Sequence, residues 1–355
     1  MKKKNPTKTS VKNSSSSRLK QRVSESYYHR AVDYFLADDF RNAYYWANLA
    51  TRFHHPEAEW LVGYLLLRGD GCQKDISKAV QYLRKASRKG VAYAKYELGV
   101  CYYLGEGVQR DVSTFIKLIK GAAKRGVPAA AETLAMALRD GEGVQKNYKL
   151  AVKWFHVAAE KGLPESMYCL YLRYSLGQGV DRNMSEAMEW LIKGAEAGHE
   201  ICQRVLGEAY YHGDGGLDVD KLLAFEWCMK AAQQGDAEAC YCVGLSYLNG
   251  DGVVANPKMA QHWLRVAARQ NYSDAQLDLA RSLFRENTKS SCEEGLTWLR
   301  RAANLKNAEA QLGLGMMLST GAYGAPMNVE DARYWYQQAL ENGEQEAQWY
   351  LERLP

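Results

Sequence analysis

Glycine pairs of the form Gly-x-Gly recur along the chain at an almost constant interval, and this repeat limits the possible folds more than any other feature. Six such turns stand at 69–71, 105–107, 141–143, 177–179, 213–215 and 250–252. A fixed period of this length is typical of a solenoid, in which each repeat is one supersecondary unit that packs only on its neighbours. The period therefore favours one continuous stack over the two or three separate domains that 355 residues could otherwise form.

One block, residues 127–162, shows how a repeat is expected to fold. Small or apolar residues fall four apart at Ala130, Leu134 and Leu138 and line one side of a first helix, here named helix A. The glycine turn then reverses the chain, because glycine reaches backbone conformations that strain other residues. A second helix, named helix B, follows with Ala151 and Trp154 three residues apart. Each repeat is thus predicted to be an antiparallel helix pair.

Capping residues are predicted at the start of every helix B. A short polar side chain precedes the first apolar position of helix B by four residues, where it can accept from unpaired amides of the first turn. These predicted N-caps are Asp75, Asp111, Asn147, Asn183, Asp220, Asn256, Ser291 and Asn328.

An aromatic residue recurs at one place in helix B, and we interpret it as a core wedge between repeats rather than as a binding ladder. The series is Tyr82, Trp154, Trp190, Trp227, Trp263, Trp298 and Trp335, with Leu118 in its place in one block.

These patterns predict an all-α, right-handed solenoid of about nine antiparallel helix pairs and a C-terminal capping helix. Residues 1–26 are expected to form a basic flexible tail and residues 27–56 a degenerate first pair. The repeats occupy 57–343, and 344–355 hold the cap. The glycine turn is lost near 284–292 and enlarged at 321–326, so we expect a bend or altered curvature there.

The net charge of +5 belongs to the N-terminal tail. Residues 1–26 hold eight Lys or Arg and one Glu, which leaves 38 basic and 40 acidic residues in the remainder. Such a tail can contact nucleic acid or an anionic membrane, although it carries no aromatic side chain on which a base could stack. We favour a solvated leader.

No apolar run is long enough to span a membrane, and the first residues lack the apolar stretch of a secretory signal. The expected location is cytoplasmic, with export by a non-standard route as the alternative. The eight cysteines occupy no constant place in the repeat, so buried thiols in a reducing compartment are expected rather than a disulfide framework.

Residues 94–108 have the series Ala-x-x-x-Leu-Gly-x-x-Tyr-x-x-Gly-x-Gly-Val, and residues 151–162 have the series Ala-x-x-Trp-x-x-x-Ala-Ala-x-x-Gly. This pattern resembles the Sel-1-like repeat, a relative of the tetratricopeptide repeat, over about residues 57–355. The resemblance implies an adaptor or scaffold in signalling, protein quality control or bacterial envelope and host-interaction processes. Some secreted, cysteine-rich members bind β-lactams, but their regular cysteine pairs are missing here.

A stripe on the A helices is the predicted partner site. Counted from the small anchor residue of each helix A, such as Ala58 or Ala94, positions +3, +6 and +10 point away from the core. The resemblance implies that A helices line the concave side of the solenoid. We hypothesise a groove for a helix or extended peptide, formed by Tyr64, Val100, Leu104, Met136, Leu172, Leu176 and Leu245. In the alternative, tight curvature buries these residues against one another.

No phosphate loop, His-Glu-x-x-His helix or Gly-x-Ser-x-Gly elbow occurs, and the seven histidines are scattered. No catalytic residue, metal site, cofactor or small-molecule substrate is therefore predicted. We expect a non-enzymatic bacterial scaffold that binds another protein. The alternatives are an exported or host-directed effector or virulence factor and a β-lactam-binding or hydrolytic repeat protein.

Overall fold

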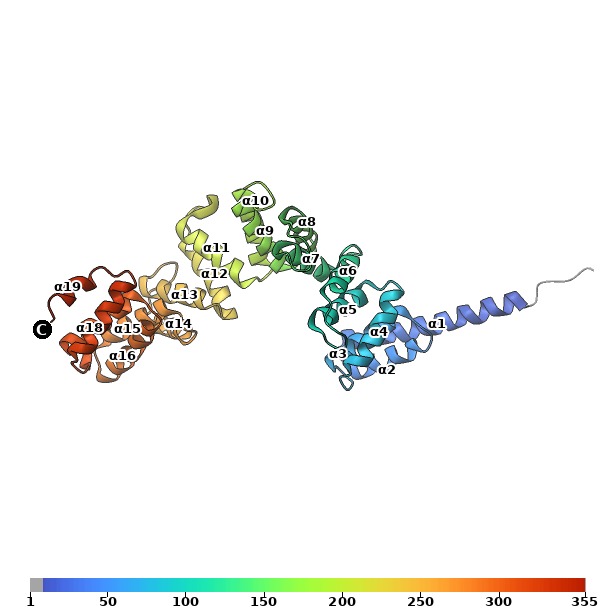
Figure 1. Cartoon of the computed structure of the whole chain (residues 1–355), viewed down its shortest axis with the longest axis horizontal. Helices are drawn as coiled ribbons and strands as arrows, with labels where there is room; N and C mark the ends of the chain where they lie inside the picture. Colours follow the sequence, from blue (N-terminus) through green and yellow to red (C-terminus); the bar gives the residue numbers. More distant parts are fainter. Residues whose placement is uncertain (1–8, 355) are drawn as a thin grey trace, which may run out of the picture. The chain divides into compact units, whose positions relative to one another are not determined.

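The computed structural model describes residues 9–354, with side chains from residue 18 onward, and every regular element in this part of the chain is helical. The chain divides into two compact units, residues 1–182 and residues 183–355. Within each unit, antiparallel helices follow one another in chain order (Figure 1). The predicted all-α solenoid class is confirmed.

The first unit consists of helix pairs in which each pair packs on the next. The pairs are α1/α2, α3/α4, α5/α6 and α7/α8, and α9 packs on α8. The bounds are α1 (Thr9–Leu36), α2 (Phe40–Thr51), α3 (Pro56–Arg68), α4 (Ile76–Arg88), α5 (Ala92–Leu104), α6 (Val112–Ala123), α7 (Pro128–Asp140), α8 (Tyr148–Ala159) and α9 (Pro164–Leu176).

The second unit has the same construction. Its first helix, α10, packs on α11, and the pairs α11/α12, α13/α14, α15/α16 and α17/α18 follow, with α19 against α18. The bounds are α10 (Met184–Glu196), α11 (Glu200–His212), α12 (Lys221–Gln234), α13 (Ala237–Asn249), α14 (Pro257–Arg269), α15 (Ser273–Glu286), α16 (Lys289–Asn304), α17 (Ala308–Thr320), α18 (Val329–Glu341) and α19 (Ala347–Leu351). Two short 3-10 helices, η1 (Asp214–Gly216) and η2 (Ala322–Gly324), lie in the turns after α11 and α17.

Seven of the eight predicted N-caps are confirmed, because each side chain accepts from a backbone amide of the first turn. They are Asp75, Asp111, Asn147, Asn183, Asp220, Asn256 and Asn328. The eighth prediction, Ser291, was wrong. Helix α16 starts three residues earlier, where Thr288 caps it and Ser291 completes a reciprocal capping box at 3.1 Å in both directions.

The N-terminal part differs from the flexible tail expected for residues 1–26. Residues 9–26 belong to α1, and residues 1–8 lie outside the described part. No glycine or proline interrupts the chain between Thr9 and Leu36, so the helix that packs on α2 can continue toward the N-terminus. Its contacts with α2 include the ring of Tyr27, 5.5 Å from that of Trp46.

In helix B, the large buried side chain is mostly the one after the predicted aromatic wedge. Of the aromatic series, Trp190 and Trp298 are buried, whereas Tyr82, Trp154, Trp227, Trp263 and Trp335 are only half-buried. The next residue is buried in every full repeat: Leu83, Ile119, Phe155, Leu191, Cys228, Leu264, Leu299 and Tyr336. The interpretation as a buried core residue is therefore right for Trp190 and Trp298. In the other repeats it was wrong by one position, because the buried residue is the one that follows the aromatic.

Glycines on helix A allow this buried residue to approach closely. A Cβ built on Gly63 would stand 2.8 Å from Leu83, and one on Gly244 would stand 2.9 Å from Leu264. Separations below 3 Å require a shift of one partner, so glycine lets the two helices of a pair pack at this distance.

Side chains of the two irregular turns between residues 284 and 326 are in contact with each other. The glycine turn after α15 is lost, and Phe284 in the last turn of this helix is buried against Gly295, where most other repeats have alanine. In the enlarged turn, the ring of Tyr323 lies 4.6 Å from that of Phe284. The predicted C-terminal cap is the five-residue α19, in which the ring of Tyr350 stacks on that of Tyr336 in α18, 5.4 Å away.

Glutamine side chains connect successive pairs in the second unit. The Nε2 atoms of Gln203, Gln276 and Gln311 donate to the carbonyls of Ala195, Ala268 and Ala303, at 3.1, 2.9 and 3.0 Å.

Nowhere in the described part does a helix combine the length and the apolar character needed to cross a bilayer.

Candidate functional site

In the first unit, the predicted groove residues lie on four successive A helices and none is buried. Tyr64, Val100, Met136 and Leu172 are half-buried on α3, α5, α7 and α9. The last residues of α5 and α9, Leu104 and Leu176, are 57% and 59% exposed. Burial of the whole set, which would have removed the groove hypothesis, is not observed.

Two of the innermost members of the same stripe are buried. Leu61 and Cys169, at position +3, are 1% and 2% exposed. On α3 and α9 the open part of the stripe is therefore confined to positions +6 and +10, whereas Glu97 and Thr133, at position +3 of α5 and α7, are half-buried.

Charged side chains border this apolar stripe. Arg68 lies over the ring of Tyr64 at 5.5 Å and pairs with Asp70 at 2.8 Å. Burial raises the pKa of Glu97 above its usual range, and the charge of Arg68 opposes this in part. The raised pKa reflects partial desolvation of the Glu97 carboxyl beside these apolar side chains.

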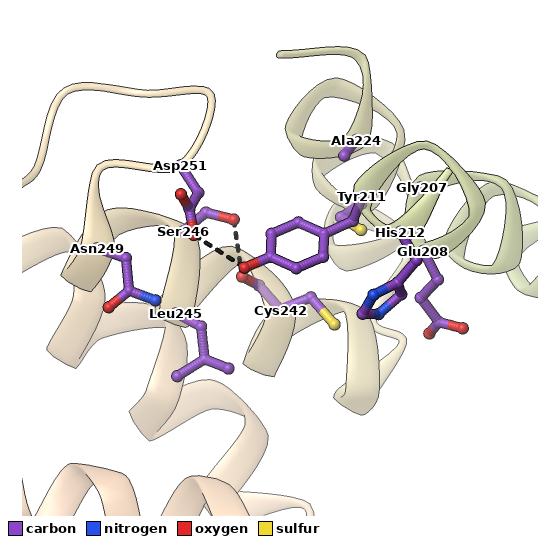
Figure 2. A pocket seen from close by; sticks show the side chains of 11 residues that line it. Gly207, Glu208, Tyr211, His212, Ala224, Cys242, Leu245, Ser246, Asn249 and Asp251 are labelled. Atoms are coloured by element: carbon purple, nitrogen blue, oxygen red, sulfur yellow. Dashed lines mark hydrogen bonds between the residues drawn. The ribbon is translucent and has the colours of Figure 1, made fainter. Parts of the chain in front are cut away.

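In the second unit, Leu245 lines a pocket between α11, α12 and α13, with a volume of about 250 Å³. Figure 2 shows the ring of Tyr211 extending from α11 toward α13, with Cys242 and Leu245 on α13 and His212 and Glu208 on α11. The complete lining is Gly207, Glu208, Tyr211, His212, Ala224, Cys228, Cys242, Leu245, Ser246, Asn249 and Asp251.

The inner wall of the pocket is made of small side chains. Gly207 on α11 faces Ala224 and Cys228 on α12, and a Cβ on Gly207 would stand 2.5 Å from the Cys228 sulfur. Burial and a hydrogen bond with Cys242 raise the pKa of the Cys228 thiol, the hydrogen bond being the larger cause. The Cys228 thiol is therefore neutral near pH 7 and acts as a small apolar residue in the wall between the three helices.

The outer rim of the pocket is polar and ordered by hydrogen bonds. The hydroxyl of Tyr211 donates to Asp251 at 3.0 Å, and the Nζ of Lys221 contacts the other oxygen of Asp251 at 2.5 Å. The hydrogen bond from Lys221 lowers the pKa of the Asp251 carboxyl, and the hydrogen bond to Asp251 raises the pKa of Tyr211. The rim thus holds a fixed carboxylate beside an apolar wall.

The sequence pattern found part of this pocket. The stripe positions +3, +6 and +10 supply Glu208, His212, Cys242, Leu245 and Asn249. The stripe rule missed two lining residues: Tyr211, which precedes the stripe residue His212, and Cys228, which lies on helix B. The signal for Cys228 was its small size at a position where other full repeats have larger residues.

The described residues, 9–354, contain neither a cluster of metal ligands nor a disulfide. No three His, Cys, Asp or Glu side chains in this range group in a way that could hold a metal ion. The eight cysteines form no disulfide, six are buried, and Cys72 and Cys242 are half-buried.

Comparison with known proteins identifies the repeat. A family model described as Sel1 repeat matches residues 56–91, 92–114, 128–163, 166–199, 201–236, 237–272, 273–307 and 308–344. Among curated proteins, none matches the chain significantly.

Two solved structures are similar over most of the chain. One is a protective antigen present in uropathogenic Escherichia coli strains that displays an SLR fold. It is 28% identical, with 94% of this chain and 81% of that chain covered and a TM-score of 0.60. The other is a Sel1 repeat protein from Oxalobacter formigenes, 26% identical, with 84% and 86% covered and a TM-score of 0.60.

Proposed function

Because the chain belongs to the Sel1 repeat family, whose solenoids generally serve as protein-interaction scaffolds, we propose that it is a non-enzymatic scaffold that binds a helix or extended peptide along its A helices. The proposed contact residues are Tyr64, Val100, Leu104, Met136, Leu172 and Leu176 in the first unit and Leu245 in the second.

The observation that carries the proposal is the exposure of Leu104 and Leu176 at the same position of two A helices. Large apolar side chains in equivalent, open positions of a repeat are expected where a partner covers them. Binding through successive repeats would use the i, i+3 and i+4 anchors of an amphipathic helix or alternate side chains of a strand.

The test is affinity capture from native lysate with wild type and with the double variant Leu104→Glu/Leu176→Glu. Both leucines are exposed, so the variant should fold like the wild type, which circular dichroism and thermal unfolding would check. The matched control is Leu150→Glu, an exposed leucine on helix B α8. A partner captured by wild type and control and lost from the double variant supports the groove. Equal capture by all three contradicts it.

A second candidate function is that of an exported or host-directed repeat protein. The 28% identity with the protective antigen, over 94% of this chain, favours it. Cell fractionation with an antibody against the chain tests it. Protein in the culture fluid or on the cell surface, without release of a cytoplasmic marker, supports export, and strict retention with that marker contradicts it.

A further inference from the structure

The pocket between α11, α12 and α13 exists because one core position is filled by a small side chain. In the other full repeats, the position of Cys228 is occupied by Leu, Ile, Phe or Tyr, each of which packs against helix A of its own pair. Leu264, in the next repeat, fills the space beside Gly244. Cysteine is shorter than leucine, so a hollow remains beside Gly207.

The size of the hollow limits what can occupy it. Pockets for drug-sized ligands and cofactors have volumes of roughly 300 to 1,000 Å³. About 250 Å³ is less than this, with Ala224, Cys228, Cys242 and Leu245 as the apolar lining. The space suits one or two apolar side chains presented by a larger molecule.

The charge around the pocket indicates the kind of molecule. Residues 183–355 hold 24 Asp and Glu against 15 Lys and Arg, whereas residues 1–182 hold 17 against 31. The acidic unit is therefore the one that contains the pocket.

The acidic character is also local to the rim. The Arg204 guanidinium lies within 2.8 Å of Glu208, 3.3 Å of Asp236 and 2.9 Å of Glu238. One positive charge faces three negative ones, so two negative charges remain uncompensated next to the pocket residue Glu208. An acidic segment would be repelled here, and a basic one attracted.

We propose that this pocket binds a single leucine or methionine side chain of a partner protein, in a segment that carries lysine or arginine beside that anchor. The inference rests on the proposed protein-binding function and assigns to the second unit the specificity for a basic partner. The anchor side chain packs on Cys228 and Leu245, and its basic neighbours lie near the carboxylates around Arg204.

The variant Cys228→Leu tests the pocket because it introduces the residue present at Leu83, Leu191, Leu264 and Leu299. It fills the hollow with a side chain that the repeat accepts elsewhere, so the protein is expected to stay folded. The matched control is Cys292→Val in the same unit, which places at the start of α16 the residue found at Val112 and Val329.

The probes are short fluorescent peptides with one central leucine, methionine or alanine, flanked by lysine and arginine or by aspartate and glutamate. Fluorescence anisotropy measures their affinity for the full chain. The basic leucine and methionine peptides are expected to bind about tenfold more tightly than the basic alanine peptide, because only they bury an apolar side chain. Cys228→Leu should remove this preference, Cys292→Val should keep it, and high salt should weaken binding severalfold.

Thiol labelling gives a second readout within one molecule. Cys242 lines the pocket and Cys72 lies in the first unit, and both are half-buried. The basic leucine peptide should slow maleimide labelling of Cys242 and leave that of Cys72 unchanged. Equal labelling rates with and without peptide would contradict occupation of the pocket.

Several results would overturn the proposal. A basic leucine peptide that binds no better than the alanine peptide removes the anchor, and tighter binding of acidic peptides removes the charge assignment. If Cys228→Leu captures the native partner as well as wild type does, while Leu104→Glu/Leu176→Glu loses it, the pocket inference fails and the groove function stands. If the double variant keeps the partner and Cys228→Leu loses it, the groove of the first unit fails instead.

Discussion

The ring of Phe284 packs directly on Gly295, with its Cε1 atom 2.7 Å from the place where a Cβ on Gly295 would stand. Phe284 is 6% exposed and lies in the last turn of α15, where its ring occupies the space that a side chain at position 295 would need. The small residue on α16 thus makes room for the large one on α15.

Gly295→Ala is expected to destabilise the protein by about 1–3 kcal/mol, since a methyl group would overlap the ring despite the better helix propensity of alanine. Denaturant unfolding measures the change. Gly313→Ala is the matched control, because a Cβ there meets nothing closer than 3.8 Å, and it should be neutral or slightly stabilising. A second change, Phe284→Leu, should reduce the cost of Gly295→Ala, and a strictly additive double variant would argue against the contact.

Leu305→Gln is expected to stabilise the second unit. The side chain of Gln203 accepts a hydrogen bond from Gln234 at 2.8 Å, and that of Gln311 accepts one from Asn342 at 3.0 Å. Both donors stand directly before the glycine with positive φ that follows a helix B. At the corresponding place near Gln276 stands Leu305, which is 45% exposed, and the buried Oε1 of Gln276 has no partner within the described residues.

A glutamine at position 305 would supply the missing donor, with a gain of about 1 kcal/mol. Thermal unfolding of Leu305→Gln, Gln276→Leu and the double variant measures the coupling. The gain should vanish in the Gln276→Leu background, and a gain that persists there would show that only the exposed leucine mattered.

Lys306→Gly is expected to add about 1 kcal/mol of stability. Lys306 has a φ of 65°, at the helix end where most repeats have glycine, and a side chain in this left-handed region is strained. The midpoint of denaturant unfolding gives the change. Asn271→Gly, at a φ of 64°, is the control and should gain less, because asparagine tolerates this conformation. Chain entropy opposes both changes because glycine is freer in the unfolded chain, so equal gains at both positions would contradict a larger side-chain strain at Lys306.

The stability of the first unit should depend on the ionisation of Glu97. Burial raises the pKa of Glu97, so its protonated form is favoured in the folded chain. The stabilisation is fully present below the unfolded pKa of about 4.3 and is lost as the pH rises through the higher folded pKa.

Glu97→Gln removes the charge, so this variant should be more stable than wild type at pH 7 and about equal to it below pH 4. Thermal unfolding followed by circular dichroism over this pH range measures the difference. Glu106→Gln, at an exposed turn residue, should show no such dependence. A constant difference between Glu97→Gln and wild type across the range would contradict the role of ionisation.

The sequence was sufficient for the repeat, because glycine turns and caps are local signals. Asp75 and Asn147 cap the helices where their spacing predicted. Ser291 was misplaced since the period alone set its position, and the loss of the preceding turn allowed α16 to begin at Thr288. The aromatic wedge was displaced by one residue, because the rotation of helix B against its neighbours depends on packing and not on spacing.

The candidate site was only partly predictable for the same reason. The stripe rule gave Leu245 and Asn249, which need only the geometry of one helix. The pocket also needs Tyr211 and Cys228, whose contributions depend on the separation between three helices. That separation follows from Gly207, and a pattern of single residues does not express it.

The size of the side chain at the position of Cys228 decides whether a recess is open in that repeat. In the other full repeats, a larger buried side chain occupies the position of Cys228. A leucine-to-cysteine change at Leu264 would open a second recess one repeat further on, and a leucine at Cys228 would close the present one. If a partner docks in this recess, as we propose, the docking site can move along the solenoid by single substitutions that leave the turns, caps and helix lengths unchanged.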